Sequence, residues 1–227
     1  KNGMVSGQEK GLLPSNELMF DKHFVVVGSG FGGMAMAIRL RALGANVTMV
    51  ERLTSLGGRA QVFKRNGFTH DAGPTVITAP FLFDELFSLF GKNREDYCDL
   101  IPLDTWYDFI FEDGSKFSYT GDLDHTFSQI RQFEPKDVKG YKGLLDLSES
   151  IFKVGFEQLS DQPFTKFWTM LKQLPALLKL QSYRTVYGLV SKYIHNEQLR
   201  KVFSIHPLLV GGNPFTTTSI YTLIHFL

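Results

Sequence analysis

The feature that constrains this chain most is a glycine-rich turn between an apolar strand and a helix. Residues 25–33 read Val-Val-Val-Gly-Ser-Gly-Phe-Gly-Gly, so Gly28, Gly30 and Gly33 form a G-x-G-x-x-G pattern. In such a unit the first glycine permits a tight turn, the second lets the backbone approach a pyrophosphate, and the third lets the helix pack closely on the sheet. The free N–H groups at the start of the helix then face the anion. The pattern predicts a dinucleotide-binding unit.

The residues around this turn predict a βαβ arrangement. We expect a strand over His23–Val27, an amphipathic helix over Phe31–Leu43 and a second strand over Asn46–Val50, with Gly44 ending the helix. Strands that are joined by a helix favour a parallel pair with a right-handed crossover.

An acidic residue closes the second predicted strand. Glu51 stands 23 residues after Gly28, where a carboxylate can accept hydrogen bonds from the hydroxyls of an adenosine ribose. The same charge disfavours NADP, because it repels the additional 2′-phosphate. The unit by itself leaves NAD and FAD open.

Beyond residue 60 the chain changes to hairpin and helix patterns. Asn66-Gly67 and Asp113-Gly114 predict two hairpin turns. The expected strands and helices cover Gln61–Phe63, Phe68–Asp71, Phe81–Phe90 (helix), Trp106–Phe111, Ser115–Tyr119, Asp122–Phe133 (helix) and Pro135–Leu147 (helix), followed by a helical pattern over Ser148–Tyr193.

The predicted fold class is therefore α/β. It consists of a Rossmann-like βαβ module with a parallel sheet, plus an α+β, helix-rich region for substrate and membrane contact that is incomplete. We expect a flexible N-terminal tail over residues 1–20, the nucleotide-binding module over 21–80, and the substrate-binding, helical region over 81–227, truncated at its C-terminal end.

Composition argues against several other classes of protein. The 24 Lys and Arg balance 23 Asp and Glu, so no overall charge favours nucleic acid. The single cysteine, Cys98, rules out an internal disulfide. No stretch reaches the ~20 apolar residues of a membrane-spanning helix. No Ser-His-Asp, Cys-His or metal-ligand arrangement is recognisable, so no metal site is expected.

Two further segments indicate which dinucleotide binds. Arg52–Arg59 ends in Gly-Gly-Arg, and Phe68–Thr75 ends in Asp-Ala-Gly-Pro-Thr. An acid, a short spacer and Gly-Gly-Arg resemble the FAD-binding signature of the amine oxidase and carotenoid desaturase superfamily, in which the second segment passes near the flavin ring. Gly57 and Gly58 would let a loop lie against the cofactor, and Arg59 can pair with phosphate. The resemblance implies FAD.

The residues expected to contact the cofactor come from these segments. They are Gly28, Ser29, Gly30, Phe31, Gly32, Gly33, Glu51, Arg52, Gly57, Gly58, Arg59, Gly73, Pro74 and Thr75.

A third segment narrows the family. Phe203–His225 reads FSIHPLLVGGNPFTTTSIYTLIH and resembles the phytoene desaturase family over its whole length, and Tyr183–Tyr187 looks familial as well. The chain is thus identified as a member of the bacterial and fungal carotenoid (phytoene) desaturases, represented by an N-terminal portion. The resemblance implies that two hydrogens leave adjacent saturated carbons of a long polyene, with hydride passing to the flavin. A quinone or oxygen would reoxidise the reduced flavin.

The resemblance also implies an apolar substrate and a membrane. Phytoene or a related polyene offers no polar handle, so its recognition requires an apolar tunnel. Residues 164–193 carry five Lys and Arg and no acid among many apolar residues, which favours contact with a membrane surface. The alternative is a helix pair that packs on its own domain. We expect a cytoplasmic protein, peripheral on the inner face of the membrane, with no nucleic-acid partner.

The catalytic residue is not assigned by the sequence. The second hydrogen leaves as a proton, and His70 and His206 are weak candidates for its acceptor. His70 lies in a segment whose relatives work mainly through backbone and apolar groups, and His206 precedes Pro207 in a pattern typical of a structural histidine.

Three other functions are compatible with parts of the sequence. A flavin amine oxidase would share the first motifs but not the Phe203–His225 segment. A carotenoid isomerase or ketolase would share the whole scaffold. The third alternative is an inactive portion of a longer protein that binds FAD weakly.

Overall fold

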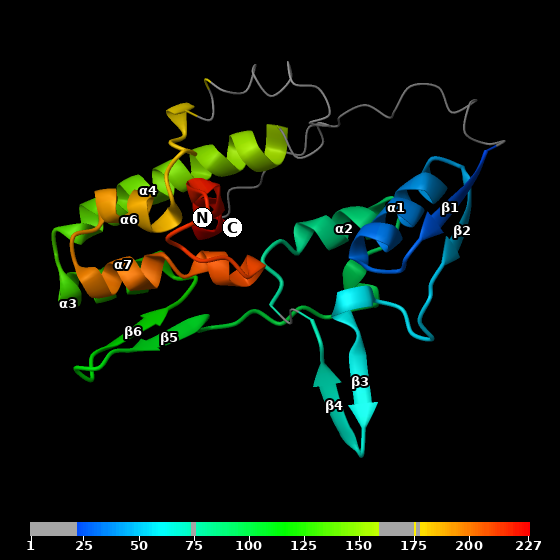
Figure 1. The fold of residues 1–227 in the computed structure, drawn as a ribbon, viewed down its shortest axis with the longest axis horizontal. Coiled ribbons are helices and arrows are strands. Elements are labelled where there is room, and N and C mark those ends of the chain that lie inside the picture. The colour runs from blue at the N-terminus through cyan, green and yellow to red at the C-terminus, as the bar shows by residue number, and fades with distance from the viewer. Residues whose placement is uncertain (1–21, 74–75, 159–174, 176–177) are drawn as a thin grey trace. The chain divides into compact units, whose positions relative to one another are not determined.

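The computed structural model of the protein describes residues 22–73, 76–158, 175 and 178–227 (Figure 1). The chain divides into two compact units, Lys1–Leu100 and Ile101–Leu227. The expected module boundary at residue 80 falls within the first unit, and the expected tail over residues 1–20 lies outside the described residues. The division into residues 1–20, 21–80 and 81–227 stays a prediction.

The first unit begins with the βαβ arrangement. Strand β1 (His23–Val27), helix α1 (Phe31–Ala42) and strand β2 (Asn46–Val50) follow one another, and the two strands pair in parallel from His23 opposite Asn46 to Val27 opposite Val50. The predicted Rossmann-like unit is confirmed. The prediction of an amphipathic α1 is wrong, because apolar residues surround most of the helix and its basic residues fall in the last turn.

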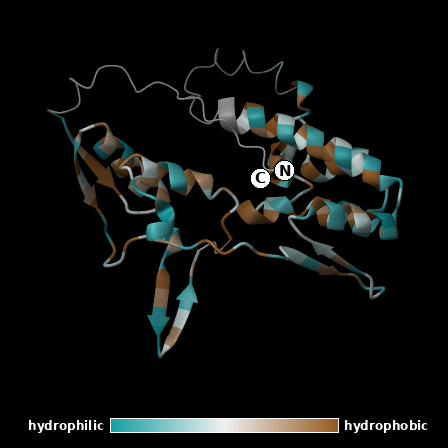
Figure 2. Ribbon diagram, turned by 180° about the vertical axis from the view of Figure 1, so that it is seen from behind, coloured by the Kyte–Doolittle hydropathy of each residue, from teal (hydrophilic) through white to brown (hydrophobic). Residues whose placement is uncertain are grey.

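Helix α1 covers one face of this small sheet. Val26 faces the helix, whereas Val25 and Val27 on the other face are 60% and 85% exposed. Figure 2 shows the hydrophobic colour that runs along β1 and β2. In the described part of the chain, an apolar sheet face is thus left in contact with solvent.

A hairpin and a second helix complete the described part of this unit. The elements are a 3₁₀ turn η2 (Gly58–Ala60), β3 (Val62–Arg65), β4 (Phe68–Asp71), α2 (Phe81–Ser88) and a 3₁₀ turn η3 (Arg94–Asp96). The β3–β4 pair is antiparallel, and Asn66 and Gly67 both have positive φ, as the predicted two-residue turn requires. Arg39 of α1 forms two hydrogen bonds to Glu85 of α2, at 2.7 and 3.1 Å.

The second unit packs helices against a hairpin. Its elements are β5 (Tyr107–Ile110), β6 (Lys116–Tyr119), α3 (Leu123–Phe133), α4 (Asp137–Phe152), a π-helical segment η4 (Lys153–Gln158), α6 (Val186–Tyr193), α7 (Glu197–Phe203) and two 3₁₀ segments, η5 (His206–Val210) and η6 (Ser219–His225). The fully buried aromatic and aliphatic side chains of β6, α4, α6 and α7 form the core. The predicted hairpin and the first two helices are confirmed, but α4 continues five residues beyond Leu147.

A buried carboxylate joins two parts of this unit. Asp137, at the start of α4, is completely buried and accepts hydrogen bonds from the backbone N–H groups of His195 and Asn196 and from the His195 ring. These donors lie between α6 and α7, so the side chain satisfies the backbone of the turn that connects these helices.

A chain of hydrogen bonds crosses the core of the second unit. His225 Nε2 lies 3.0 Å from the Phe203 carbonyl, which can only accept, so Nε2 carries the proton and Nδ1 is the acceptor. Nδ1 then accepts from the Tyr119 hydroxyl at 3.0 Å, and Tyr119 accepts from Tyr141 at 3.1 Å. The network requires a neutral His225. Burial lowers the pKa of His225 to about 4 and raises the pKa of Tyr141 to about 12.

We predict that Gly140→Ala destabilises the second unit. A Cβ at this position in α4 would lie 1.9 Å from the carbonyl oxygen of Tyr193 in α6, so the helices must separate. The free energy of unfolding should fall by about 3 kcal/mol. Gly155→Ala is the matched control, because no atom of the described residues lies within 4 Å of its Cβ position. Both tryptophans belong to this unit, so urea unfolding followed by tryptophan fluorescence measures the change; equal stability of the two variants would contradict the close approach.

We also predict that acid destabilises the second unit through His225. Its pKa is about 4 in the folded chain against an ordinary 6.5. Above pH 6.5 the ring is neutral in both states. Between pH 6.5 and 4 only the unfolded chain takes up the proton, so stability falls with pH, by about 3 kcal/mol in total. His225→Gln keeps a donor and an acceptor but does not titrate, and its unfolding free energy should depend less steeply on pH over this window. An unchanged slope would exclude His225 as the source.

Candidate functional site: the glycine-rich turn of the first unit

The turn after β1 is built on one close backbone contact. A Cβ on Gly33 would lie 2.0 Å from the carbonyl oxygen of Gly28, so only glycine permits the helix to sit this close to the turn. Gly28 has φ +98°, which also favours glycine, and its N–H donates to the Val50 carbonyl at 2.8 Å. The first and third glycines of the pattern therefore have the structural roles that the sequence predicted.

The remaining glycines leave room in front of the helix. Nothing lies within 4 Å of the Cβ positions of Gly30 and Gly32. Gly30 is the N-cap of α1, no side chain caps the helix, and no acidic residue occupies its first turn. The free N–H groups of this helix end and its partial positive charge are therefore available to an anion.

Glu51 is held against this turn by three donors. Its Oε2 accepts hydrogen bonds from the Ser29 N–H at 2.8 Å and from the Ser29 hydroxyl at 2.7 Å, and its Oε1 accepts from the Leu53 N–H at 2.9 Å. These hydrogen bonds lower the pKa of Glu51 to about 2. The Leu53 N–H has the largest effect, followed by the Ser29 hydroxyl and the Ser29 N–H, and the Arg52 N–H has a smaller one. The carboxylate is therefore ionised at neutral pH.

The Gly-Gly-Arg loop lies directly on the glycine-rich turn. The Gly57 N–H donates to the Ser29 carbonyl at 3.0 Å, and a Cβ on Gly58 would lie 3.1 Å from the Cα of Gly30. Both loop glycines have positive φ. The glycine-rich turn and the Gly-Gly-Arg loop, which the sequence analysis identified as separate motifs, thus contact each other through their backbones and form one backbone surface.

The third segment joins the same backbone surface. A Cβ on Gly73 would lie 2.5 Å from the Arg59 carbonyl oxygen and 2.7 Å from the Cα of Ala60, and the Ala72 N–H donates to the Gln61 carbonyl at 3.0 Å. The structure therefore brings together the segments around residues 28–33, 51–59 and 73. The predicted Pro74 and Thr75 lie outside the described residues.

Two arginines beside this surface are free to bind a ligand. The side chains of Arg52 and Arg59 are exposed, and neither guanidinium has a hydrogen bond or ion pair within the described part of the chain. An unpaired cation next to a helix N-terminus adds to the attraction for phosphate.

The two candidate histidines lie in different settings. His70 is exposed on β4, opposite Phe63 of the hairpin. His206 is 3% exposed in the core of the second unit, where its ring centroid lies 4.1 Å from that of His225 and its Nδ1 has no partner among the described residues. Burial is the main cause that holds the pKa of His206 well below its usual value, and the charge interaction with His225 lowers it further. A catalytic role for either histidine stays a prediction.

The residue with an unexpected role is Ser29. The sequence placed it among the residues that contact the cofactor, but its side chain is completely buried and bonded to Glu51. The spacing of the motif gave no signal for this bond. The only hint in the sequence is that Ser29 stands between Gly28 and Gly30, and that Glu51 directly follows the second predicted strand.

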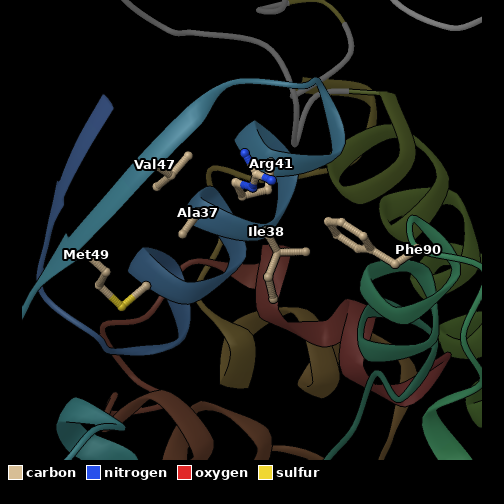
Figure 3. A pocket seen from close by; sticks show the side chains of 6 residues that line it. All are labelled: Ala37, Ile38, Arg41, Val47, Met49 and Phe90. Carbon is tan, nitrogen blue, oxygen red and sulfur yellow. The ribbon is translucent and has the colours of Figure 1, made fainter. Parts of the chain in front are cut away.

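The first unit also has a shallow pocket (Figure 3). It measures about 290 Å³ and is lined by Ala37, Ile38, Arg41, Val47, Met49 and Phe90. These residues come from the second half of α1, from β2 and from the turn that follows α2, and none belongs to the predicted cofactor site. Among the described residues, no group of three or more His, Cys, Asp or Glu side chains can hold a metal ion.

Comparison with known proteins agrees with this geometry. A family model described as an NAD(P)-binding Rossmann-like domain matches residues 26–92. The chain is 50% identical over 206 residues to a lycopene-forming phytoene desaturase of Pantoea ananas, covering 91% of this chain and 42% of the relative. A neurosporene-forming phytoene desaturase of Rhodobacter capsulatus is 36% identical over 200 residues, covering 88% of this chain and 38% of the relative.

Over this length the chain belongs to the carotenoid desaturase family. The chain is also 34% identical over 202 residues to a 4,4′-diapophytoene desaturase of Staphylococcus haemolyticus. This match covers 88% of this chain and 40% of the relative. The chain spans about two fifths of the length of the curated relatives that it matches.

A solved structure supports the fold of this desaturase-family chain. Putrescine oxidase bound to putrescine aligns with a TM-score of 0.53 at 15% identity, covering 89% of this chain and 41% of the oxidase. This likeness concerns the fold alone. In the described part of the chain, no helix combines the length and the apolar character that crossing a bilayer requires.

We predict that Gly33→Ala opens the turn and that Gly32→Ala does not. The first substitution drives a Cβ to 2.0 Å from a backbone oxygen, whereas the second meets nothing within 4 Å. The stability of β1 and β2 should fall by about 3 kcal/mol in Gly33→Ala and change by less than about 1 kcal/mol in Gly32→Ala. Hydrogen exchange of the β1 and β2 amides, resolved by mass spectrometry, measures both. Equal protection in the two variants would refute the close contact.

Proposed function

We propose that this chain supplies the FAD-binding module of a carotenoid desaturase that acts on phytoene or a related polyene. The observation that carries the proposal is the meeting of three segments, around residues 28–33, 51–59 and 73, in one backbone surface beside a helix N-terminus. The 50% identity to a lycopene-forming phytoene desaturase supports the substrate class.

The residues fit a dinucleotide with a ribose and a pyrophosphate. The open space in front of Gly30 and the uncapped start of α1 suit the pyrophosphate. Glu51 is ionised and can accept from a ribose hydroxyl. Arg59, whose guanidinium has no partner among the described residues, can donate to a phosphate oxygen. Gly58 keeps the loop backbone close to the turn, so that a side chain does not block the approach.

When bound, the flavin supplies the redox chemistry by accepting hydride from a C–H bond of the substrate. The residues of this chain bind and orient the cofactor. The assignment of the cofactor contacts to Gly28, Gly30, Gly33, Glu51 and Arg59 is part of this proposal. The acceptor of the substrate proton stays unassigned: His70 is exposed on β4, and His206 is buried in the core of the second unit.

The partners follow from the proposed substrate. A polyene dissolves in membranes, so we propose that the protein works at a membrane surface, peripheral on the cytoplasmic face, with a quinone or oxygen as the electron acceptor. Within the described residues, Leu178 and Tyr183 are 53% and 67% exposed. The basic Lys179 beside them in the sequence is exposed, whereas Arg184 is half-buried. An exposed apolar and basic surface of this kind suits lipid headgroups. The residues from 159 to 174 of the predicted membrane segment lie outside the described part.

We predict that Arg59→Ala weakens FAD binding roughly ten- to a hundredfold, because a hydrogen bond to a charged group contributes about 1.5–3 kcal/mol. Arg65→Ala is the control, since Arg65 is an exposed arginine of the same unit on the β3–β4 hairpin, away from the predicted contacts. Quenching of flavin fluorescence on titration of FAD with the full chain measures both dissociation constants. If Arg65→Ala weakens binding as much as Arg59→Ala, the phosphate role of Arg59 is wrong.

The reaction is tested with the complete reading frame in cells that supply phytoene. The expected product absorbs at longer wavelength, because each desaturation extends the conjugated chain. Phytoene that persists unchanged while the protein carries FAD would refute the proposed substrate. A coloured isomer without net loss of hydrogen, identified by mass spectrometry, would favour an isomerase.

A further inference from the structure

The 3₁₀ segment η5 and the loop that follows it present apolar side chains to solvent. Leu208, Leu209 and Val210 of η5 are 65%, 41% and 54% exposed, and Phe215 in the loop is 60% exposed. We call these four side chains the η5 surface. Residues 202–227, which contain it, include no Asp, Glu, Lys or Arg, and both of their histidines are buried. The η5 surface is therefore apolar and belongs to an uncharged stretch of the chain.

The backbone that carries the η5 surface is held in place by the rest of the second unit. The Gly212 N–H donates to the Pro207 carbonyl at 2.8 Å, and the Tyr187 N–H of α6 donates to the Pro214 carbonyl at 3.0 Å. The ring of Phe215 lies 4.6 Å from the ring of Tyr187. A surface that is already ordered loses less conformational entropy when a ligand binds to it.

The absence of charge limits what the η5 surface can bind. A charged ligand would find no opposite charge within residues 202–227, and the burial of its charge there would be unfavourable. A membrane surface is bound by apolar residues together with Lys or Arg, which this stretch lacks. Ile110 of β5 offers a contrast, because it is 78% exposed but stands opposite Lys116 of β6. The η5 surface thus favours an uncharged, apolar ligand.

We propose that the η5 surface contacts the hydrocarbon chain of the polyene and that Leu208, Val210 and Phe215 determine how tightly the polyene is held. This proposal rests on the proposed function. A polyene has no polar handle, so its affinity comes from the apolar area that binding removes from water. These three side chains are more than half exposed and have most of their surface left to bury.

Leu208→Asn in the complete reading frame, loaded with FAD, tests this contact. The KM for phytoene supplied in liposomes should rise roughly tenfold, because a buried leucine side chain is replaced by a polar one of similar size. The dissociation constant of FAD, measured by quenching of flavin fluorescence, should not change. Ile110→Asn is the matched control, since Ile110 is an equally exposed aliphatic residue of the same unit, and its KM should stay that of the unaltered protein. Equal KM values for the two variants would overturn the proposal.

A photoreactive p-benzoylphenylalanine at position 210 tests the occupant directly. Irradiation with phytoene in liposomes should give a protein–phytoene adduct, identified by mass spectrometry, and the same group at position 110 should give none. An adduct with lipid alone, with a second copy of the protein or with another part of the same chain would overturn the proposal. If phytoene is converted but neither test separates the two positions, only this inference fails. If the FAD-loaded protein leaves phytoene unchanged, the proposed function fails, and the inference fails with it.

Discussion

The contact of Gly33 with the carbonyl of Gly28 determines how the first unit is arranged. It places the start of α1 directly over the end of β1, at a distance that no side chain on Gly33 would allow, and Gly28 adopts a φ of +98° that favours glycine. The Gly28 N–H then bonds to the last residue of β2, which fixes where Glu51 leaves the sheet. The uncapped N-terminal end of the helix and the acid that follows β2 are therefore positioned by the same backbone contact.

The loops that follow are built onto this turn by backbone contacts rather than by side-chain packing. Gly57 bonds to the Ser29 carbonyl, Gly58 lies against Gly30, and Gly73 lies against Arg59. Glycine is favoured at Gly57 and Gly58 by their positive φ, and at Gly73 because a Cβ would lie 2.5 Å from the Arg59 carbonyl oxygen.

Sequence reasoning found the parts of the molecule that local geometry decides. The strands over 23–27 and 46–50 and the hairpin turn at Asn66-Gly67 follow from short-range patterns, and the structure has them where expected. It missed contacts that depend on packing between distant residues. Asp137 bonds to His195, 58 positions away, and Tyr119 bonds to His225, 106 positions away. No spacing within either segment marks these partners, because burial and not periodicity brings them together.

The segment that resembles the desaturases most closely has a structural role within the described residues. Residues 203–225 contain the end of α7 and both 3₁₀ segments, and they bond to the start of α6 through pairs such as the Val186 N–H with the Thr217 carbonyl. A Cβ on Gly212 would lie 2.5 Å from the Thr217 hydroxyl oxygen, so this glycine serves packing. His206 and His225 are buried in the same core. This stretch therefore contributes to the packing of the second unit, whereas the proposed nucleotide site is built from much shorter glycine segments of the first unit.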